Sequence, residues 1–141
     1  MTILDKTLAA SALAALLAIT AQAQNAASLV VPVEKEAAPR LFVDPPLPGP
    51  LAKGVAFIPY RVENLRIMPV GGAAARALSP RVGHLHITFD DLPWQWADYG
   101  ASNTIILVEV PRGEHKVLIA VVDPEGQLLT SQSITFTSPG K

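Results

Sequence analysis

One short segment of the sequence, HLHITF, alternates polar and apolar side chains with a period of two. Its apolar side chains are Leu85, Ile87 and Phe89. This spacing is typical of a β-strand that buries one face in a core and turns the other face outward. We expect Leu85, Ile87 and Phe89 to lie in the core, with His84 and His86 together on the opposite face.

The segments around it are also strand-like. We expect one edge strand, or two short strands, in GVAFIPYRVENLRIMPV, because Pro59 and Pro69 cannot donate to a ladder. TIILVEV predicts a buried strand, residues 117–122 are apolar at nearly every position, and QLLTSQSITFT predicts a last strand. Residues 123–126, Asp-Pro-Glu-Gly, predict the hairpin turn between the last two strands. Short strands, Pro/Gly turns and no long helical pattern predict an all-β fold, a single antiparallel immunoglobulin-like sandwich over residues 54–139.

The first part of the chain has a different composition. Residues 1–23 have the features of a secretory signal peptide: Lys6 in a short polar start, an apolar Ala/Leu run and a small-residue cleavage site ending at Ala23. The apolar run is shorter than the roughly 20 residues that a membrane span needs. Residues 24–53 are rich in Ala and Pro, which predicts an extended linker without helix or sheet. We therefore expect an exported protein, periplasmic or secreted, with no transmembrane segment after cleavage of the signal peptide.

Composition excludes several kinds of site. The sequence has no cysteine, so it has no disulfide and no thiolate metal centre, blue-copper centres included. A formal net charge of -1 without a basic cluster argues against nucleic acid as a partner. Asp90 and Asp91 are adjacent, so on a strand their carboxylates point to opposite faces and do not form a glycosidase pair.

Three segments, YRVENLRIMPV, SPRVGHLHITFDDLPWQWAD and RGEHKVLI, together resemble an uncharacterised family of small exported bacterial proteins. The resemblance implies an exported protein with an immunoglobulin-like sandwich and brings no established activity. Members of that family tend to have a histidine between the two tryptophans and another in the turn after the penultimate strand. This chain has Gln95 and Glu125-Gly126 at these places.

The three histidines are candidate metal ligands. His84 and His86 put two imidazoles on one strand face, with Cβ atoms about 6.5–7 Å apart. His115 lies on a strand that we expect to pair antiparallel with theirs, and three imidazoles can hold copper or zinc in an open site. Asp90 could orient one imidazole from the second coordination shell.

The position of His115 leaves alternatives to this site. It has the parity of Val117, which turns it toward the core unless a bulge at Gly113 re-aims it. Without metal, His84 and His86 are outward polar residues and His115 caps the sandwich through a hydrogen bond. A third interpretation is a small cupin-like metal protein, because His84-x-His86 and Pro111-x-Gly113-x-His115 partly match the cupin motifs.

An aromatic loop follows the histidine strand and carries Trp94, Trp96 and Tyr99. Exposed rings there could bind a protein or a glycan partner. Alternatively, one tryptophan folds back as a lid on the core. Serines such as Ser79 and Ser133 lack the setting of a catalytic nucleophile. The sequence thus favours a binding protein over an enzyme, with metal binding at the histidines or partner binding at the aromatic loop as its activity.

Overall fold

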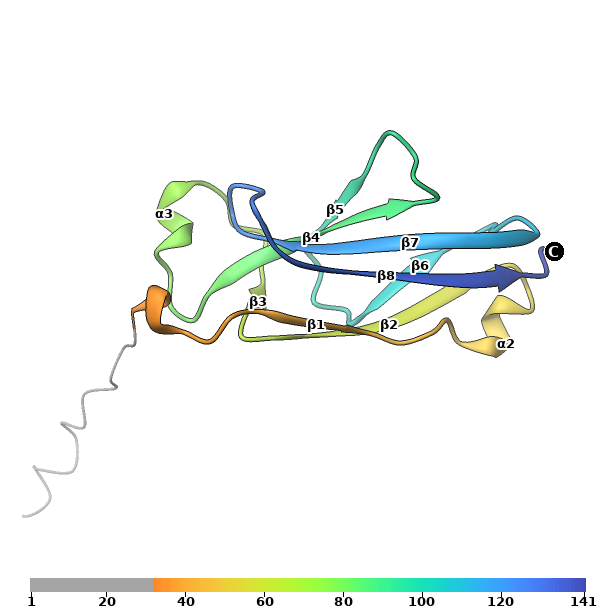
Figure 1. Ribbon diagram of the computed structural model, residues 1–141, viewed down its shortest axis with the longest axis horizontal. Helices are drawn as coiled ribbons and strands as arrows, with labels where there is room; N and C mark the ends of the chain where they lie inside the picture. Colours follow the sequence, from red (N-terminus) through yellow and green to blue (C-terminus); the bar gives the residue numbers. More distant parts are fainter. Residues whose placement is uncertain (1–31) are drawn as a thin grey trace, which may run out of the picture. The chain divides into compact units, whose positions relative to one another are not determined.

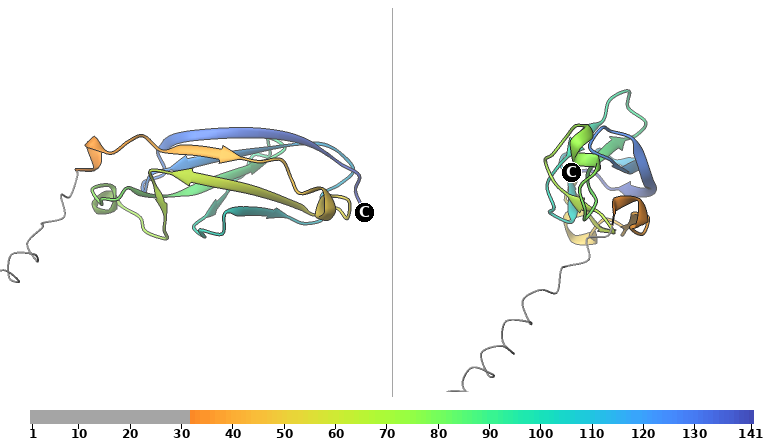
Figure 2. Two further views of the ribbon diagram at one scale, coloured as in Figure 1. Left: turned by 90° about the horizontal axis from the view of Figure 1, so that it is seen from below. Right: turned by 90° about the vertical axis from the view of Figure 1, so that its left-hand side faces the viewer.

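Two β-sheets form the part of the chain that the structure, a computed structural model, describes, which is residues 32–141 (Figures 1 and 2). One sheet has the strand order β1-β2-β6, and the other has the order β3-β4-β7-β8 with β5 paired to β4. In chain order the elements are η1 (Val33–Lys35), β1 (Arg40–Val43), α2 (Pro48–Leu51), β2 (Ala56–Glu63), β3 (Arg66–Ile67), α3 (Ala73–Arg76), β4 (Val82–Phe89), β5 (Trp96–Asp98), β6 (Thr104–Leu107), β7 (Gly113–Val122) and β8 (Leu128–Ser138).

The core lies between the two sheets and follows the period of two. From β4, Leu85 and Ile87 are completely buried, as the alternation predicts. β7 contributes Val117, Ile119 and Val121, which are also completely buried. Antiparallel pairs predominate and β3 pairs parallel with β4. The predicted all-β sandwich is confirmed, while its immunoglobulin-like topology stays a prediction.

Residues 54–70 contain two strands, β2 and β3, which agrees with the second of the two alternatives; β2 lies in the middle of its sheet, so the alternative of an edge strand is wrong for it. Its proline is tolerated because of where the neighbouring strand ends. Pro59 comes directly before Tyr60, which pairs with the last residue of β1, Val43. The Pro59 carbonyl still accepts a hydrogen bond from the Asp44 N–H at 3.0 Å. The missing N–H therefore falls at the edge of the ladder, where its loss costs little.

The expected linker differs from the structure over part of its length. Residues 40–43 form β1, which pairs antiparallel with β2, and Leu41 and Val43 pack against the core. This stretch lies between Pro39 and Pro45 and contains no proline, so its backbone can form a ladder. Further along, Pro48 stands at the start of α2, where a helix needs no N–H donor. The density of prolines predicted an extended chain but concealed a strand between two of them.

β6 also departs from the expectation of a buried strand. Ile105 is buried, but Ile106 and Val108 are exposed because β6 is the last strand of its sheet. In the second sheet, the turn between β7 and β8 is as predicted, with the Gly126 N–H donating to the Asp123 carbonyl at 2.9 Å.

The predicted signal peptide, residues 1–23, lies outside the described residues. Among residues 32–141, no helix has the length and apolar character needed to cross a membrane.

Candidate functional site

A pair of histidines lies on the outer face of the second sheet, opposite the core. His84 and His86 share this face of β4 because successive side chains of a strand alternate, and Leu85 between them points into the core. Their Nε2 atoms are 3.1 Å apart, and their ring centroids are 4.9 Å apart. The prediction that the two imidazoles share a face is thus confirmed, and the structure brings them into direct contact.

The cross-strand neighbours of His86 leave room around its ring. In register with His86 are Ala97 on β5 and Ala120 on β7, both with small side chains. Gln95, on the loop before β5, places its Nε2 atom 3.1 Å from Nδ1 of His86. Gly126, in the β7–β8 turn, approaches the same ring, since a Cβ built there would lie 3.9 Å from Cε1. Gln95 and Gly126 therefore both border His86.

His84 is covered, contrary to the expectation of an outward polar residue. Only 5% of its surface is exposed. Tyr99 stacks on its ring, with centroids 4.5 Å apart and an interplanar angle of 29°. The two rings meet because the antiparallel register of β4 and β5, in which Leu85 pairs with Asp98, brings residue 99 opposite residue 84. An open cavity of about 280 Å³ adjoins both residues, and its other lining residues are Pro69, Val70, Gly71 and Pro124.

The hydrogen bonds indicate how protons are distributed over the pair. If Gln95 donates to Nδ1 of His86, then His86 carries its proton on Nε2 and donates it to Nε2 of His84. His84 is then protonated on Nδ1, an atom that is buried without a partner among the described residues. Rotating the Gln95 amide reverses each of these bonds and leaves Nδ1 of His84 as a bare acceptor. In both arrangements a single proton lies between the two Nε2 atoms.

The His84 ring of this contact favours its neutral form. Burial lowers the pKa of His84 below its ordinary value, and the neighbouring His86 lowers it further, while Asp123 opposes the shift. A neutral imidazole has the free lone pair that a metal ion requires.

His115 does not join the pair. It lies on the core face of β7, only 7% exposed, five residues before Ala120, which faces His86. Five residues of strand span about 17 Å, and the two faces are separated by the sheet itself. The structure therefore does not bring together the three imidazoles that the three-histidine and cupin-like interpretations require. No bulge at Gly113 re-aims the ring, because the β7–β8 register is regular from Gly113 to Val121.

His115 is bonded to the end of β4 instead. Its Nδ1 atom lies 2.7 Å from Oδ2 of Asp90, and its Nε2 atom lies 2.9 Å from the carbonyl oxygen of Pro111. This is the capping arrangement considered from the sequence, with Asp90 orienting His115 rather than the His84–His86 pair. Asp91 points elsewhere and pairs with Lys116 at 3.0 Å.

The aromatic loop follows β4 and contains a short strand, β5, which begins at Trp96; its part between β4 and β5 projects from the sheet (Figures 1 and 2). Its two tryptophans have different environments, and their ring centroids are 6.1 Å apart. Trp96, in register with Ile87, packs against the core, whereas Trp94 is 55% exposed. Tyr99 is 44% exposed even though it covers His84. One tryptophan is thus a lid on the core, and the other is available at the surface.

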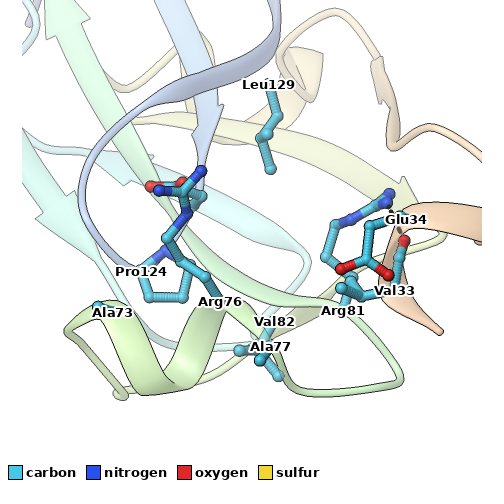
Figure 3. Close-up of a pocket in the computed structure, with 10 residues that line it drawn as sticks. Val33, Glu34, Ala73, Arg76, Ala77, Arg81, Val82, Pro124 and Leu129 are labelled. Carbon is cyan, nitrogen blue, oxygen red and sulfur yellow. Dashed lines mark hydrogen bonds and ion pairs between the residues drawn. The ribbon is translucent and has the colours of Figure 1, made fainter.

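A larger cavity, of about 400 Å³, lies on the other side of the β7–β8 turn and contains no histidine (Figure 3). Arg76 and Arg81 line opposite walls of it. Arg76 braces the turn, with Nε 2.9 Å from Oδ2 of Asp123 and a terminal nitrogen 2.8 Å from Oε2 of Glu125. This brace had no signal in the sequence, because Arg76 lies 47 residues before Asp123.

No cluster of three or more histidine and carboxylate groups suited to a metal ion occurs in residues 32–141. What the site offers a metal ion is the His84–His86 pair, with Gln95 behind His86 and Tyr99 beside His84. Gln95 could have been suspected from the sequence, since it lies between the two tryptophans.

The protein is thus an all-β sandwich in which the His84–His86 pair lies on one sheet, beside an exposed aromatic loop. The chain belongs to DUF6130, a family of unknown function that matches it over residues 1–141. No curated protein and no solved structure matches it.

Proposed function

We propose that this protein binds one divalent transition-metal ion, of the copper or zinc class, between Nε2 of His84 and Nε2 of His86. The observation that carries the proposal is the 3.1 Å separation of these two atoms. Metal–imidazole bonds are about 2.0–2.1 Å long, so two nitrogens on one ion lie about 2.9–3.4 Å apart, from square-planar to tetrahedral angles. The two rings are therefore close to a chelating arrangement without movement of the strand.

The ion would take the place of the proton that lies between the two rings. His86 would then carry its proton on Nδ1 and donate it to Oε1 of Gln95, which orients the ring and makes it a better ligand. His84 supports the same state because its lowered pKa keeps it neutral. Two protein ligands leave coordination positions for water or an external molecule, and the cavity beside His84 and Tyr99 adjoins them. The proposed activity is binding alone.

A calorimetric titration tests the proposal. Cu(II) and Zn(II) are added separately to the full chain, to His86→Gln and to His115→Gln. We expect one-to-one binding at micromolar concentration in the wild type and in His115→Gln, and no saturable binding in His86→Gln. Gln95→Leu should bind about 10–100-fold more weakly, because it removes the partner of the ligand ring.

Other outcomes contradict this site. Equal binding by all variants would place the ion elsewhere. Loss of binding in His115→Gln alone would show that His115 is a ligand, although the structure separates it from the His84–His86 pair. Absence of saturable binding in the wild type would overturn the proposal.

Exposure of the aromatic loop favours a second function, the binding of a glycan or protein partner. Trp94 and Tyr99 present two rings to solvent, and such rings stack on sugars or dock in protein pockets. Trp94→Ala should abolish retention on an immobilised polysaccharide or partner, while His86→Gln should not. Equal retention of both variants would remove this function.

We also propose that the protein acts outside the bacterial cytoplasm, after cleavage behind Ala23. The support is the sequence of residues 1–23 and their small-residue cleavage site. Intact mass measurement of the protein from cell envelope and medium should find a chain that begins at Gln24. A full-length chain in the cytoplasm would contradict export.

A further inference from the structure

His115 is held by acceptors on both of its ring nitrogens. Oδ2 of Asp90 lies at Nδ1 and the Pro111 carbonyl oxygen lies at Nε2, at 2.7 and 2.9 Å. A carbonyl oxygen only accepts, and so does an ionised carboxylate. A neutral imidazole has one N–H, so it can donate to one of these acceptors and not to both. The geometry is therefore that of an imidazolium, which donates from both nitrogens.

The surroundings keep this charged ring in place. Phe89 and Phe136 flank it, with ring centroids 5.0 and 5.8 Å away. The other carboxylate oxygen of Asp90 accepts the Lys116 backbone N–H at 2.8 Å. The result is an ion pair between a buried imidazolium and a carboxylate that is 35% exposed, and both partners have their hydrogen bonds satisfied.

We propose that His115 and Asp90 form a pH-dependent clamp, which fixes the first half of the aromatic loop while His115 is charged and holds it less firmly when His115 loses its proton, because the neutral ring keeps only one of its two bonds. The clamp concerns residues 90–94 and does not depend on metal binding.

The segment that the clamp holds is unfavourable by itself. Asp90 and Asp91 follow β4 with φ of 51° and 53°, in the left-handed region that few residues adopt. The turn is fixed by the Asp90 N–H, which donates to the Lys116 carbonyl at 2.8 Å, and by the Leu92 N–H, which donates to the Phe89 carbonyl at 3.1 Å. The carboxylate of Asp90 joins this turn to β7 through two further bonds. Loss of the charge on His115 therefore weakens a conformation that has little intrinsic stability.

The second half of the loop is anchored separately. β5 pairs with β4, and the Tyr60 hydroxyl donates to the Gly100 carbonyl at 3.1 Å. Loosening of the clamp should therefore move Trp94 and leave Trp96 in place.

The elements packed around His115 differ in the charged groups that each contributes. From the end of β4 they are Asp90, bonded to the ring, and Asp91, which pairs with Lys116. On β7 itself Glu114 and Lys116 flank the ring and point to the other face. On the loop before β7, Arg112 donates to the Pro139 carbonyl at 3.0 Å. β8 places the uncharged Phe136 opposite His115.

Burial lowers the pKa of His115, but the hydrogen bonds to Asp90 and Pro111, with the charge of Asp90, outweigh burial and raise the pKa above the ordinary 6.5. The loosening should therefore occur on the alkaline side of 6.5.

The test follows two spectroscopic signals, histidine ring protons and tryptophan emission, which are easy to assign because the chain has few of either residue. The chain has three histidines and two tryptophans, and both tryptophans follow Asp90 within six residues. The ring protons of His115 are followed by NMR and the tryptophan emission by fluorescence, on the full chain, over the same pH series and with a chelator present. We expect His115 to titrate above pH 6.5 and the emission to change with the same midpoint.

Two aspartate variants separate the clamp from other effects. Asp90→Asn can donate from its amide to Nδ1 of a neutral His115, so it keeps both bonds to the ring and should show no emission change over this range. Asp91→Asn, which alters the neighbouring carboxylate that does not contact His115, should keep the wild-type midpoint. His115→Gln, which cannot titrate, should also abolish the change and serves if Asp90→Asn does not fold.

Emission that is independent of pH while His115 titrates would overturn the clamp. So would an unchanged midpoint in Asp90→Asn or His115→Gln. Because the chelator removes metal, these results are independent of the metal titration described above.

Discussion

Gly83, which precedes the paired histidines, lies where two strands approach unusually closely. A Cβ atom at this position would be 2.2 Å from the Val122 carbonyl oxygen and 3.0 Å from Cδ1 of Leu65. The first of these is a backbone atom of the neighbouring strand, so it cannot move aside without displacing β7. The absence of a side chain at Gly83 thus allows β4 to pair with β7 from His84 onward.

Gly83→Ala should therefore destabilise the protein by at least about 1–3 kcal/mol, the usual cost of forcing extra atoms into a packed interior. Gly49→Ala is the matched control, because Gly49 lies in α2 and has no atom within 4 Å of a Cβ built there. The free energy of unfolding from urea denaturation is the measurement. Similar stabilities for the two variants would contradict the close approach of the strands.

At the same scale, the alternation of the sequence predicts which face His84 and His86 share but does not predict their burial. His84 is covered by Tyr99, and their meeting depends on the register of β4 and β5, which no local pattern encodes. For His115 the parity with Val117 was a sufficient guide to its inward position. Its partner Asp90 was identified as a residue that could orient one imidazole, but the sequence does not indicate which imidazole, because it does not say which strand end lies beside which.

Among the elements, β1 shows how composition can conceal a strand. The prolines around it indicated a linker, yet Leu41 and Val43 pack against the core from the edge of the first sheet. Pattern reasoning located most strands of the second sheet, where the alternation or the apolar runs are long. It failed for β1, which has only four residues, and for the exposure of β6, which depends on strand order.

Truncation tests whether β1 belongs to the domain. A chain that begins at Val31 should have the stability of the full chain, whereas a chain that begins at Asp44 should lose about 2–4 kcal/mol, since two partly buried aliphatic side chains and a ladder are removed. Urea denaturation measures both. Equal stability of the two truncations would show that the segment acts only as a linker.

For the whole molecule, two histidines make the stability depend on pH in opposite directions. His115 has a raised pKa, so its contribution is complete below about 6.5 and is lost as the pH rises through the raised value. His84 has a lowered pKa, so its contribution is complete above about 6.5 and is lost as the pH falls toward the lowered value.

Thermal unfolding should consequently show a maximum of Tm near pH 6.5 between about pH 5 and pH 8.5, in the absence of metal. Asp90→Asn should flatten the alkaline side, and His84→Gln should flatten the acidic side. A Tm that changes in one direction across the whole range in the wild type would contradict the assignment of opposite shifts.

The turn between β7 and β8 has a consequence for the whole surface. Pro124 lines both cavities, so a single turn of chain is the wall between them. Arg76 holds that wall from the side of the larger cavity, through Asp123 and Glu125. A molecule that drew Arg76 away from these carboxylates would loosen the boundary of the smaller cavity as well. The two cavities thus share the β7–β8 turn as a common wall. Arg76, which does not line the smaller cavity, therefore helps to set the shape of the space beside His84.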